Sequence, residues 1–383
     1  MARPAVIAIR RMLPYLLGAA GVAAIMLAIP IFIGSPGFGY DYTAYDLAAR
    51  RLASGLPLYP PGTAEAYNAG AFAGLYLYAP PLAVALMPAA AVPADTAAML
   101  WFIARIAILA AGCALLPVRI EVRAATLGVA ALSYPTLIDL NLGNLSIVLF
   151  ALSAVAWRWL DRPLGSVALA LILTVRYPFV TVLIGWLGRG QLRPAAWTIG
   201  AGLAIAALTL PIVGIAGYVD YVTILRGLGD IGTGPDNLTL GTTVAALGGA
   251  SVIGQAANLA GFGLAFAAVV YAARRRDREV GLAVAVSASL LFAPFFHDHY
   301  LVELLLPAAL LAQRHRWWGL ALPLLGWLPD ALLPLVAIAG VVGPFFAGAP
   351  PAEPPGSQLG GMQPPGRTRA SVPGGHPSDG RVG

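Results

Sequence analysis

The sequence predicts an all-α integral membrane protein, a multi-span bundle of about 10 to 13 transmembrane helices. Of the 383 residues, 59% are hydrophobic and only 10% are charged, whereas soluble domains carry about 45–50% apolar and about 25% charged residues. The apolar residues fall in runs near the length of a membrane-spanning helix. Composition therefore excludes a soluble enzyme, and a single cysteine, Cys113, excludes a disulfide framework or a cysteine zinc cluster.

The first apolar run, residues 12–33, follows three arginines. It is longer than the core of a signal peptide and shows no small-residue cleavage site, so we expect a retained helix. Residues 35–80 are polar and aromatic and are expected to form a structured loop. Further spans are expected at 96–117, 124–139, 144–157, 164–175, 178–187, 195–216, 255–272, 280–296, 300–312, 319–328 and 331–346.

The distribution of arginine predicts the orientation, because cytoplasmic loops of membrane proteins are enriched in positive charge. All 23 basic residues are arginine. With a cytoplasmic N-terminus, 15 of them lie in inner loops and 4 in outer loops, provided that Pro178 divides 164–187 into two short helices. We therefore expect a multi-pass plasma-membrane protein whose 35–80 loop is extracytoplasmic.

Residues 347–383 are rich in proline and glycine and have little apolar surface to bury. They are expected to form a disordered cytoplasmic tail after a transmembrane domain at 1–346. The net charge of +6 does not indicate a nucleic-acid partner, because the arginines form no stripe on a soluble face.

Ionisable groups at the ends of membrane spans are the first place to look for function. Asp41 and Asp46 directly follow the first span, and a partly desolvated carboxylate there is suited to act as a general base. The alternative is a solvated loop acid, or a helix cap in which Asp41 or Thr43 precedes a helix at 45–52. The tyrosines and prolines that follow suit either a substrate groove or an interfacial aromatic belt.

Two further outer turns carry polar residues. In the segment 139–144, Asn141 and Asn144 are suited to bind a polar head group, although Asn and Gly also favour ordinary turns. Arg176 lies in a short turn before Pro178. Its guanidinium has the geometry to bind a phosphate, and the alternative is that it snorkels to lipid head groups.

The segment Phe296-His297-Asp298-His299 follows a span. A third metal ligand is missing from the local sequence, so we expect no metal site but a hydrogen-bonding or acid–base role toward a sugar or phosphate. Asn237 lies in a polar outer loop that is either solvated or able to close over a substrate. No phosphate-cradling loop is present, which argues against an ATP-driven pump.

The order of these motifs resembles a known family. They are Asp41 with Tyr45, Gly55 with Tyr59, Tyr76-x-Tyr78-x-Pro80-Pro81, Asn141-x-Gly143-Asn144, Arg176-Tyr177-Pro178 and His297-x-His299. Over residues 10–345 the chain resembles glycosyltransferase family 87, membrane enzymes of the GT-C type that use polyprenyl-phosphate sugars. The family includes phosphatidylinositol-mannoside mannosyltransferases and a related arabinofuranosyltransferase.

The resemblance implies residue roles. Asp41 would be the base that deprotonates the acceptor hydroxyl, and Arg176, where many relatives have Lys, would bind the donor phosphate with His297 and His299. Gly143-Asn144-Leu145-Ser146 departs from the Gly-Gln-x-Asn that the family often carries. Substrate contacts are expected from Tyr45, Asp46, Tyr59, Tyr78, Asn141, Asn144 and Asn237.

The expected reaction moves a sugar, with mannose favoured, from a polyprenyl-phosphate donor to a glycolipid or lipoglycan acceptor at the extracytoplasmic face. It would invert the configuration at the anomeric carbon and give an α-linkage. No cofactor or metal is expected, and membrane lipids are expected to surround the protein. The alternatives are an arabinofuranosyltransferase, an inactive scaffold, and a transporter. A transporter predicts charges at mid-membrane, where only Arg105 lies clearly within a span.

Overall fold

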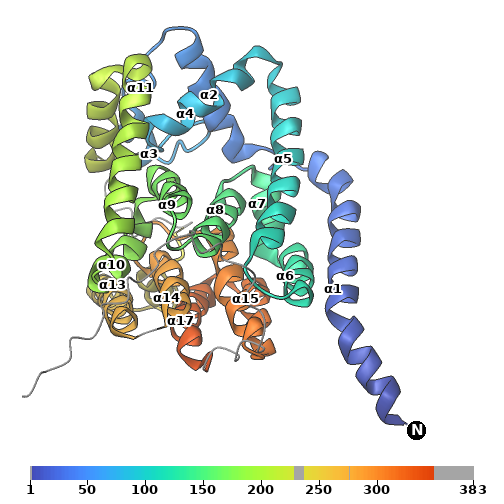
Figure 1. Cartoon of the computed structure of the whole chain (residues 1–383). Helices are drawn as coiled ribbons and strands as arrows, with labels where there is room; N and C mark the ends of the chain where they lie inside the picture. Colours follow the sequence, from blue (N-terminus) through green and yellow to red (C-terminus); the bar gives the residue numbers. More distant parts are fainter. Residues whose placement is uncertain (1, 228–236, 276, 349–383) are drawn as a thin grey trace, which may run out of the picture. The chain divides into compact units, whose positions relative to one another are not determined.

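A computed structural model describes residues 2–227, 237–275 and 277–348, with side chains from residue 11 onward (Figure 1). Every regular element among these residues is an α-helix or a 3-10 helix, so the predicted all-α class is confirmed. The predicted tail beyond residue 348 and two acids of the 230–237 loop, Asp230 and Asp236, lie outside the described residues.

Four of the described helices are long and apolar enough to cross a membrane, which confirms a multi-span protein. They are α1 (Ala2–Ile33), α5 (Ala94–Leu115), α11 (Leu192–Gly227) and α13 (Ser251–Arg274). A fifth crossing is formed if α7 (Tyr134–Leu142) and α8 (Ser146–Arg158), which meet at an angle of 117°, count as one span.

The other expected spans also coincide with helices, but these helices are shorter than a bilayer. A 13-residue helix such as α9 is about 20 Å long, against a hydrocarbon core of about 30 Å. Prolines at helix starts limit several of them, because proline is accepted in the first turn but not in the interior. The short α-helices are α6 (Ile120–Leu132), α9 (Pro163–Val175), α10 (Val180–Gly188), α14 (Arg278–Leu291), α15 (Leu305–Gln313), α16 (Ala321–Leu324) and α17 (Leu333–Val342).

The centre of the bundle is formed by α14 and α15, whose residues are almost all buried. The helix α14 packs against α10, α13, α15 and α17. By contrast, α11 exposes large apolar side chains such as Leu203, Leu208 and Ile215. An apolar helix surface of this kind is stable against lipid but not against water.

The helices α1 and α6 pack side by side (Figure 1), and glycines allow their close approach. A Cβ atom added to Gly128 would lie 2.3 Å from the carbonyl oxygen of Leu17, and one added to Gly21 would lie 2.7 Å from Cα of Gly128. Small residues at such crossings allow the van der Waals contact that holds membrane helices together.

The segment that follows α1 contains α2 (Tyr40–Ala53) and α3 (Thr63–Asn68) and leads to α4 (Pro80–Leu86). The helix α2 begins at Tyr40, before Asp41 and Thr43, so neither of these residues is its N-cap. Gly39 is its N-cap, with φ of 70°, a left-handed conformation that favours glycine. Asp41 therefore lies in the first turn of α2.

Candidate active site

A cavity of about 420 Å³ collects most of the predicted site residues. Its size lies within the roughly 300–1,000 Å³ of ordinary ligand pockets. The polar lining comes from separate segments, namely the start of α2, the α7–α8 bend, the turn between α9 and α10, and the chain after α14. Predicted residues at the cavity are Asp41, Tyr78, Asn144, Arg176, Asn237, His297 and His299.

The rest of the lining is aromatic or aliphatic, apart from Asp298. The helix α3 contributes Tyr67, the chain after it contributes Phe72 and Leu77, and α11 contributes Tyr221 and Leu225. The cavity thus offers a few polar groups beside an apolar wall, the combination expected for a ligand with both a charged and a greasy part.

Asp41 is held by an amide. Asn144 Nδ2 donates a hydrogen bond of 2.7 Å to Asp41 Oδ2. The side-chain oxygen of Asn144 accepts from the main-chain N–H of Leu145 at 2.6 Å, so the orientation of the amide is fixed. The carboxylate of Asp41 therefore has a defined position at the cavity.

The bend between α7 and α8 makes this contact possible. Gly143 has φ of 86°, and a Cβ atom there would lie 2.7 Å from Cβ of Tyr42 in α2. Only glycine combines this backbone conformation with so close an approach. The chain can thus turn beside α2 and place Asn144 next to Asp41.

Arg176 follows the last residue of α9 and is 9% exposed. Its guanidinium carbon lies 3.1 Å from the centre of the Tyr300 ring, a cation–π contact that fixes its direction. Its Nη1 atom has no hydrogen-bond partner among the described residues. A fixed, incompletely bonded guanidinium is suited to an anion such as phosphate.

Asp298 orients the segment that carries His297 and His299. Both the main-chain N–H of His299, at 2.6 Å, and its ring atom Nδ1, at 3.2 Å, lie against Asp298 Oδ1. Burial raises the pKa of Asp298, but hydrogen bonds from His299 outweigh this effect and bring it below its usual value. His299 Nε2 has no partner among the described residues, and the ring stacks on His297.

Asn237 supports this segment from a distant part of the chain. Its amide nitrogen donates to the Pro294 carbonyl, and its oxygen accepts from Phe296 N–H, both at 2.8 Å. Although Asn237 borders the cavity, these bonds assign it to positioning the chain that leads to His297.

Four residues that were expected to contact substrate do not line the cavity. Asp46 forms an ion pair of 2.7 Å with Arg50, one turn further along α2. Asn141 accepts hydrogen bonds from Ser35 Oγ and Gly39 N–H, so it fixes the link between α1 and α2.

The other two of these residues, Tyr45 and Tyr59, are buried behind Tyr78. Tyr45 donates to the Tyr78 hydroxyl at 3.2 Å, and Tyr59 donates to the Tyr78 carbonyl at 2.7 Å. Burial raises the pKa of Tyr78, so its hydroxyl stays neutral at physiological pH. These tyrosines form the supporting layer of the cavity wall.

The profile of Glycosyltransferase family 87 matches residues 76–294, more than half of the chain. The chain belongs to glycosyltransferase family 87. Membership indicates a membrane glycosyltransferase and confirms the resemblance predicted from the motifs. No curated protein and no solved structure gives a match.

The region matched to family 87 includes Tyr78, Asn144, Arg176 and Asn237. Asp41 precedes it, and His297 and His299 follow it. The cavity brings residues from inside and outside the matched region together.

Sequence reasoning missed one buried acid of this glycosyltransferase. Glu303 is fully buried, and neither carboxylate oxygen has a hydrogen-bond partner among the described residues. It interacts electrostatically with Arg176. An acid inside the apolar run 300–312 was the available signal. Among the described residues, no three His, Cys, Asp or Glu side chains are grouped so that they could hold a metal ion.

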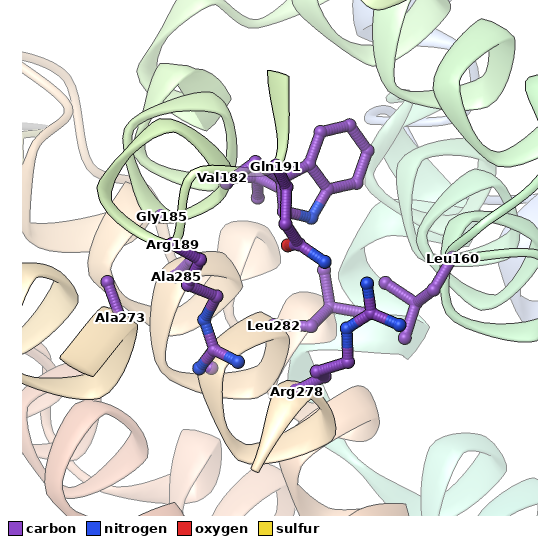
Figure 2. A pocket seen from close by; sticks show the side chains of 11 residues that line it. Leu160, Val182, Gly185, Arg189, Gln191, Ala273, Arg278, Leu282 and Ala285 are labelled. Carbon is purple, nitrogen blue, oxygen red and sulfur yellow. The ribbon is translucent and has the colours of Figure 1, made fainter. Parts of the chain in front are cut away.

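A second, much smaller cleft lies at the opposite ends of α10 and α14 (Figure 2). Its volume of about 10 Å³ holds one water molecule at most. Arg189, which lines it, already donates to the carbonyls of Ala272 and Asp277 at 2.6 and 2.9 Å. This cleft is too small for a sugar, so the large cavity is the candidate active site.

Proposed function

We propose that this family 87 glycosyltransferase moves a sugar, with mannose favoured, from a polyprenyl-phosphate donor to a glycolipid or lipoglycan acceptor. The observation that carries the proposal is the shared cavity of Asp41 and Arg176. One offers a carboxylate to an acceptor hydroxyl, and the other offers a cation to a phosphate.

In the proposed reaction, the Asp41 carboxylate takes the proton of the acceptor hydroxyl. The hydroxyl oxygen bonds to the anomeric carbon from the side opposite the phosphate, and the bond from that carbon to the phosphate oxygen breaks. A β-linked donor thus gives an α-linked product and a polyprenyl phosphate. Arg176, assisted by His297 and His299, stabilises the charge that develops on the departing phosphate.

The apolar part of the cavity supports lipid-linked substrates. Phe72, Leu77 and Leu225 border the same space as the polar groups, so a lipid chain next to a phosphate meets apolar side chains.

An extracytoplasmic active site in the plasma membrane is part of the proposal. The helices α9, α10 and α14 each have one end at the cavity, next to Arg176, Pro178 and Ala293. Their opposite ends carry Arg162, Arg189 and Arg278. Since arginine is enriched on the cytoplasmic side, this distribution supports a cavity that opens on the other side.

The test is a transfer assay in membranes that contain the protein, with labelled polyprenyl-phosphate mannose and a glycolipid extract. Parallel reactions contain the arabinofuranose carrier, and membranes with Asp41→Ala serve as the blank. We expect mannose in an α-linkage in the glycolipid fraction with the wild type alone. Transfer of arabinose alone would reject the mannose assignment, and a wild-type rate for Asp41→Ala would reject the base.

A further inference from the structure

Arg105 is an unusual residue within a long apolar helix, α5. Its side chain is 1% exposed, and its guanidinium donates to the main-chain carbonyls of Asp139, of Leu140 at 2.6 Å and of Asn144 at 3.5 Å. The carbonyls of Asp139 and Leu140 belong to the last turn of α7, where the Asp139 carbonyl also accepts from the N–H groups of Gly143 at 3.0 Å and Asn144 at 3.3 Å. A cation at a helix C-terminus is also favoured by the helix dipole.

Trp101 lies one helical turn before Arg105 and therefore on the same face of α5. Its Nε1 atom donates to the Gly143 carbonyl at 2.8 Å. Its ring stacks on Tyr42, with ring centres 5.8 Å apart and planes 25° from parallel. The two side chains thus hold consecutive parts of the α7–α8 bend, and Trp101 also contacts the residue next to Asp41.

The bend in turn holds Asp41. The side chain of Asn144 donates to the Asp41 carboxylate at 2.7 Å, and the Asn141 carbonyl accepts from Gly39 N–H, just before α2, at 2.8 Å. Each contact joins the bend to the start of α2. The helix α5 packs against α2, α7 and α8, so it supports both partners of this connection.

We propose that Trp101 and Arg105 are positioning residues of the transfer reaction, which hold the Asp41 carboxylate at the cavity through the α7–α8 bend. This inference rests on the proposed role of Asp41 as the base. Neither side chain lines the cavity, so neither touches substrate. Arg176 and His299 are placed by α9 and by the chain after α14, so we expect donor binding to depend on α5 less than the position of Asp41 does.

The proposal predicts a change in kcat with little change in the donor KM. Trp101→Phe keeps an aromatic ring against Tyr42 but removes the indole N–H, which leaves the Gly143 carbonyl without this donor. A misplaced base weakens stabilisation of the transition state but not binding of the donor. We therefore expect kcat to fall about tenfold. Arg105→Lys keeps the charge but loses the planar fork, and kcat should fall further.

A matched control is Trp157→Phe. Trp157 donates from Nε1 to Glu279 at 3.1 Å, near the end of α8 away from the bend. This substitution also removes one indole hydrogen bond from a buried tryptophan. It is expected to leave kcat unchanged per folded protein, measured after size-exclusion chromatography.

The closing experiment is a double-mutant cycle on kcat with Trp101→Phe, Asn144→Ala and their combination, beside Asp41→Asn. If Trp101 acts through the bend, the double variant is no slower than Asn144→Ala alone. The inference would be overturned if the fold-losses in kcat of the two single variants multiplied in the double variant. It would also be overturned if Trp101→Phe had the kcat of the wild type, or if Trp157→Phe lost as much kcat as Trp101→Phe. In each of these cases, an inactive Asp41→Asn variant would still support the proposed function. Full activity of Asp41→Asn would instead reject the role of Asp41 itself.

Discussion

Charged side chains near the two ends of α9, α10 and α14 differ in how many of their atoms have a bonding partner. At the end away from the cavity, both terminal nitrogens of Arg314 are bound by carboxylates of Asp277 and Glu279. At the cavity end, Arg176 Nη1, His299 Nε2 and both oxygens of Glu303 have no hydrogen-bond partner among the described residues.

The difference separates a structural site from a site prepared for a ligand. A buried polar group without a partner destabilises the folded protein by about 1–3 kcal/mol, and beside a cavity such a group can be completed by water, an ion or a substrate. The terminal nitrogens of Arg314 are already bound by internal carboxylates, and its Nε atom, which has no partner among the described residues, does not face the cavity. Polar groups at the cavity remain available to a phosphate and a sugar.

Replacing the cavity arginine should have the largest effect on substrate binding. Arg176→Gln removes the charge that we assign to the donor phosphate, and kcat/KM for the donor is expected to fall by roughly 10- to 100-fold. Arg176→Lys should recover part of it, since it restores the charge without the fork. A rate that depends on donor concentration as in the wild type would contradict the assignment.

The matching change at the other end is Arg314→Gln. It leaves Asp277 and Glu279 without their shared cation, and we expect a loss of about 2 kcal/mol in the free energy of unfolding, because both carboxylates keep some access to water. Thermal unfolding in detergent measures this. Transfer per folded protein should stay near the wild-type rate, and a selective loss of activity would contradict the comparison.

His299→Ala is expected to give a smaller effect on transfer, a roughly tenfold decrease in kcat/KM, since one hydrogen bond to the sugar or the leaving phosphate is lost. His315→Ala is the control, because His315 lies in the turn after α15, outside the cavity. Equal rates for both variants would remove His299 from the proposed site.

The smallest expected effect is the pH dependence of the stability that the ion pair between Asp277 and Arg314 contributes. Burial raises the pKa of Asp277, but hydrogen bonds from Arg314 and from Val280 N–H bring it below its usual value of 3.8. A carboxylate with a lowered pKa stabilises the fold above its unfolded-state pKa, and this contribution is lost as the pH falls through the folded-state value. The difference in unfolding temperature between wild type and Asp277→Asn should therefore shrink below about pH 4; a constant difference would contradict the pairing.

The sequence predicted the helical class and the segments that meet at the cavity, because apolar runs and charged ends are local properties. The run expected at 164–175 coincides with α9 at Pro163–Val175, so the sequence also predicted this short helix. It did not predict which helices pack against each other, because packing is not a property of composition.

Within the site, helical phase separates two acids that were both expected to act there. Asp41 and Asp46 are five residues apart on α2, which turns them about 140° from each other, so only the first can face the cavity while the second meets Arg50. The Asn144 contact to Asp41 spans 103 residues. Such a pairing depends on the α7–α8 bend and is invisible to spacing along the chain.

The central claim is that Asp41 acts on the substrate and that its neighbour Asp46 does not. The most direct measurement compares transfer rates of Asp41→Asn and Asp46→Asn, normalised to folded protein in the same membranes. We predict a loss of at least about 100-fold for Asp41→Asn, and a rate close to wild type for Asp46→Asn, because Asp46 pairs with Arg50 and does not line the cavity. Retained transfer by Asp41→Asn would contradict the account.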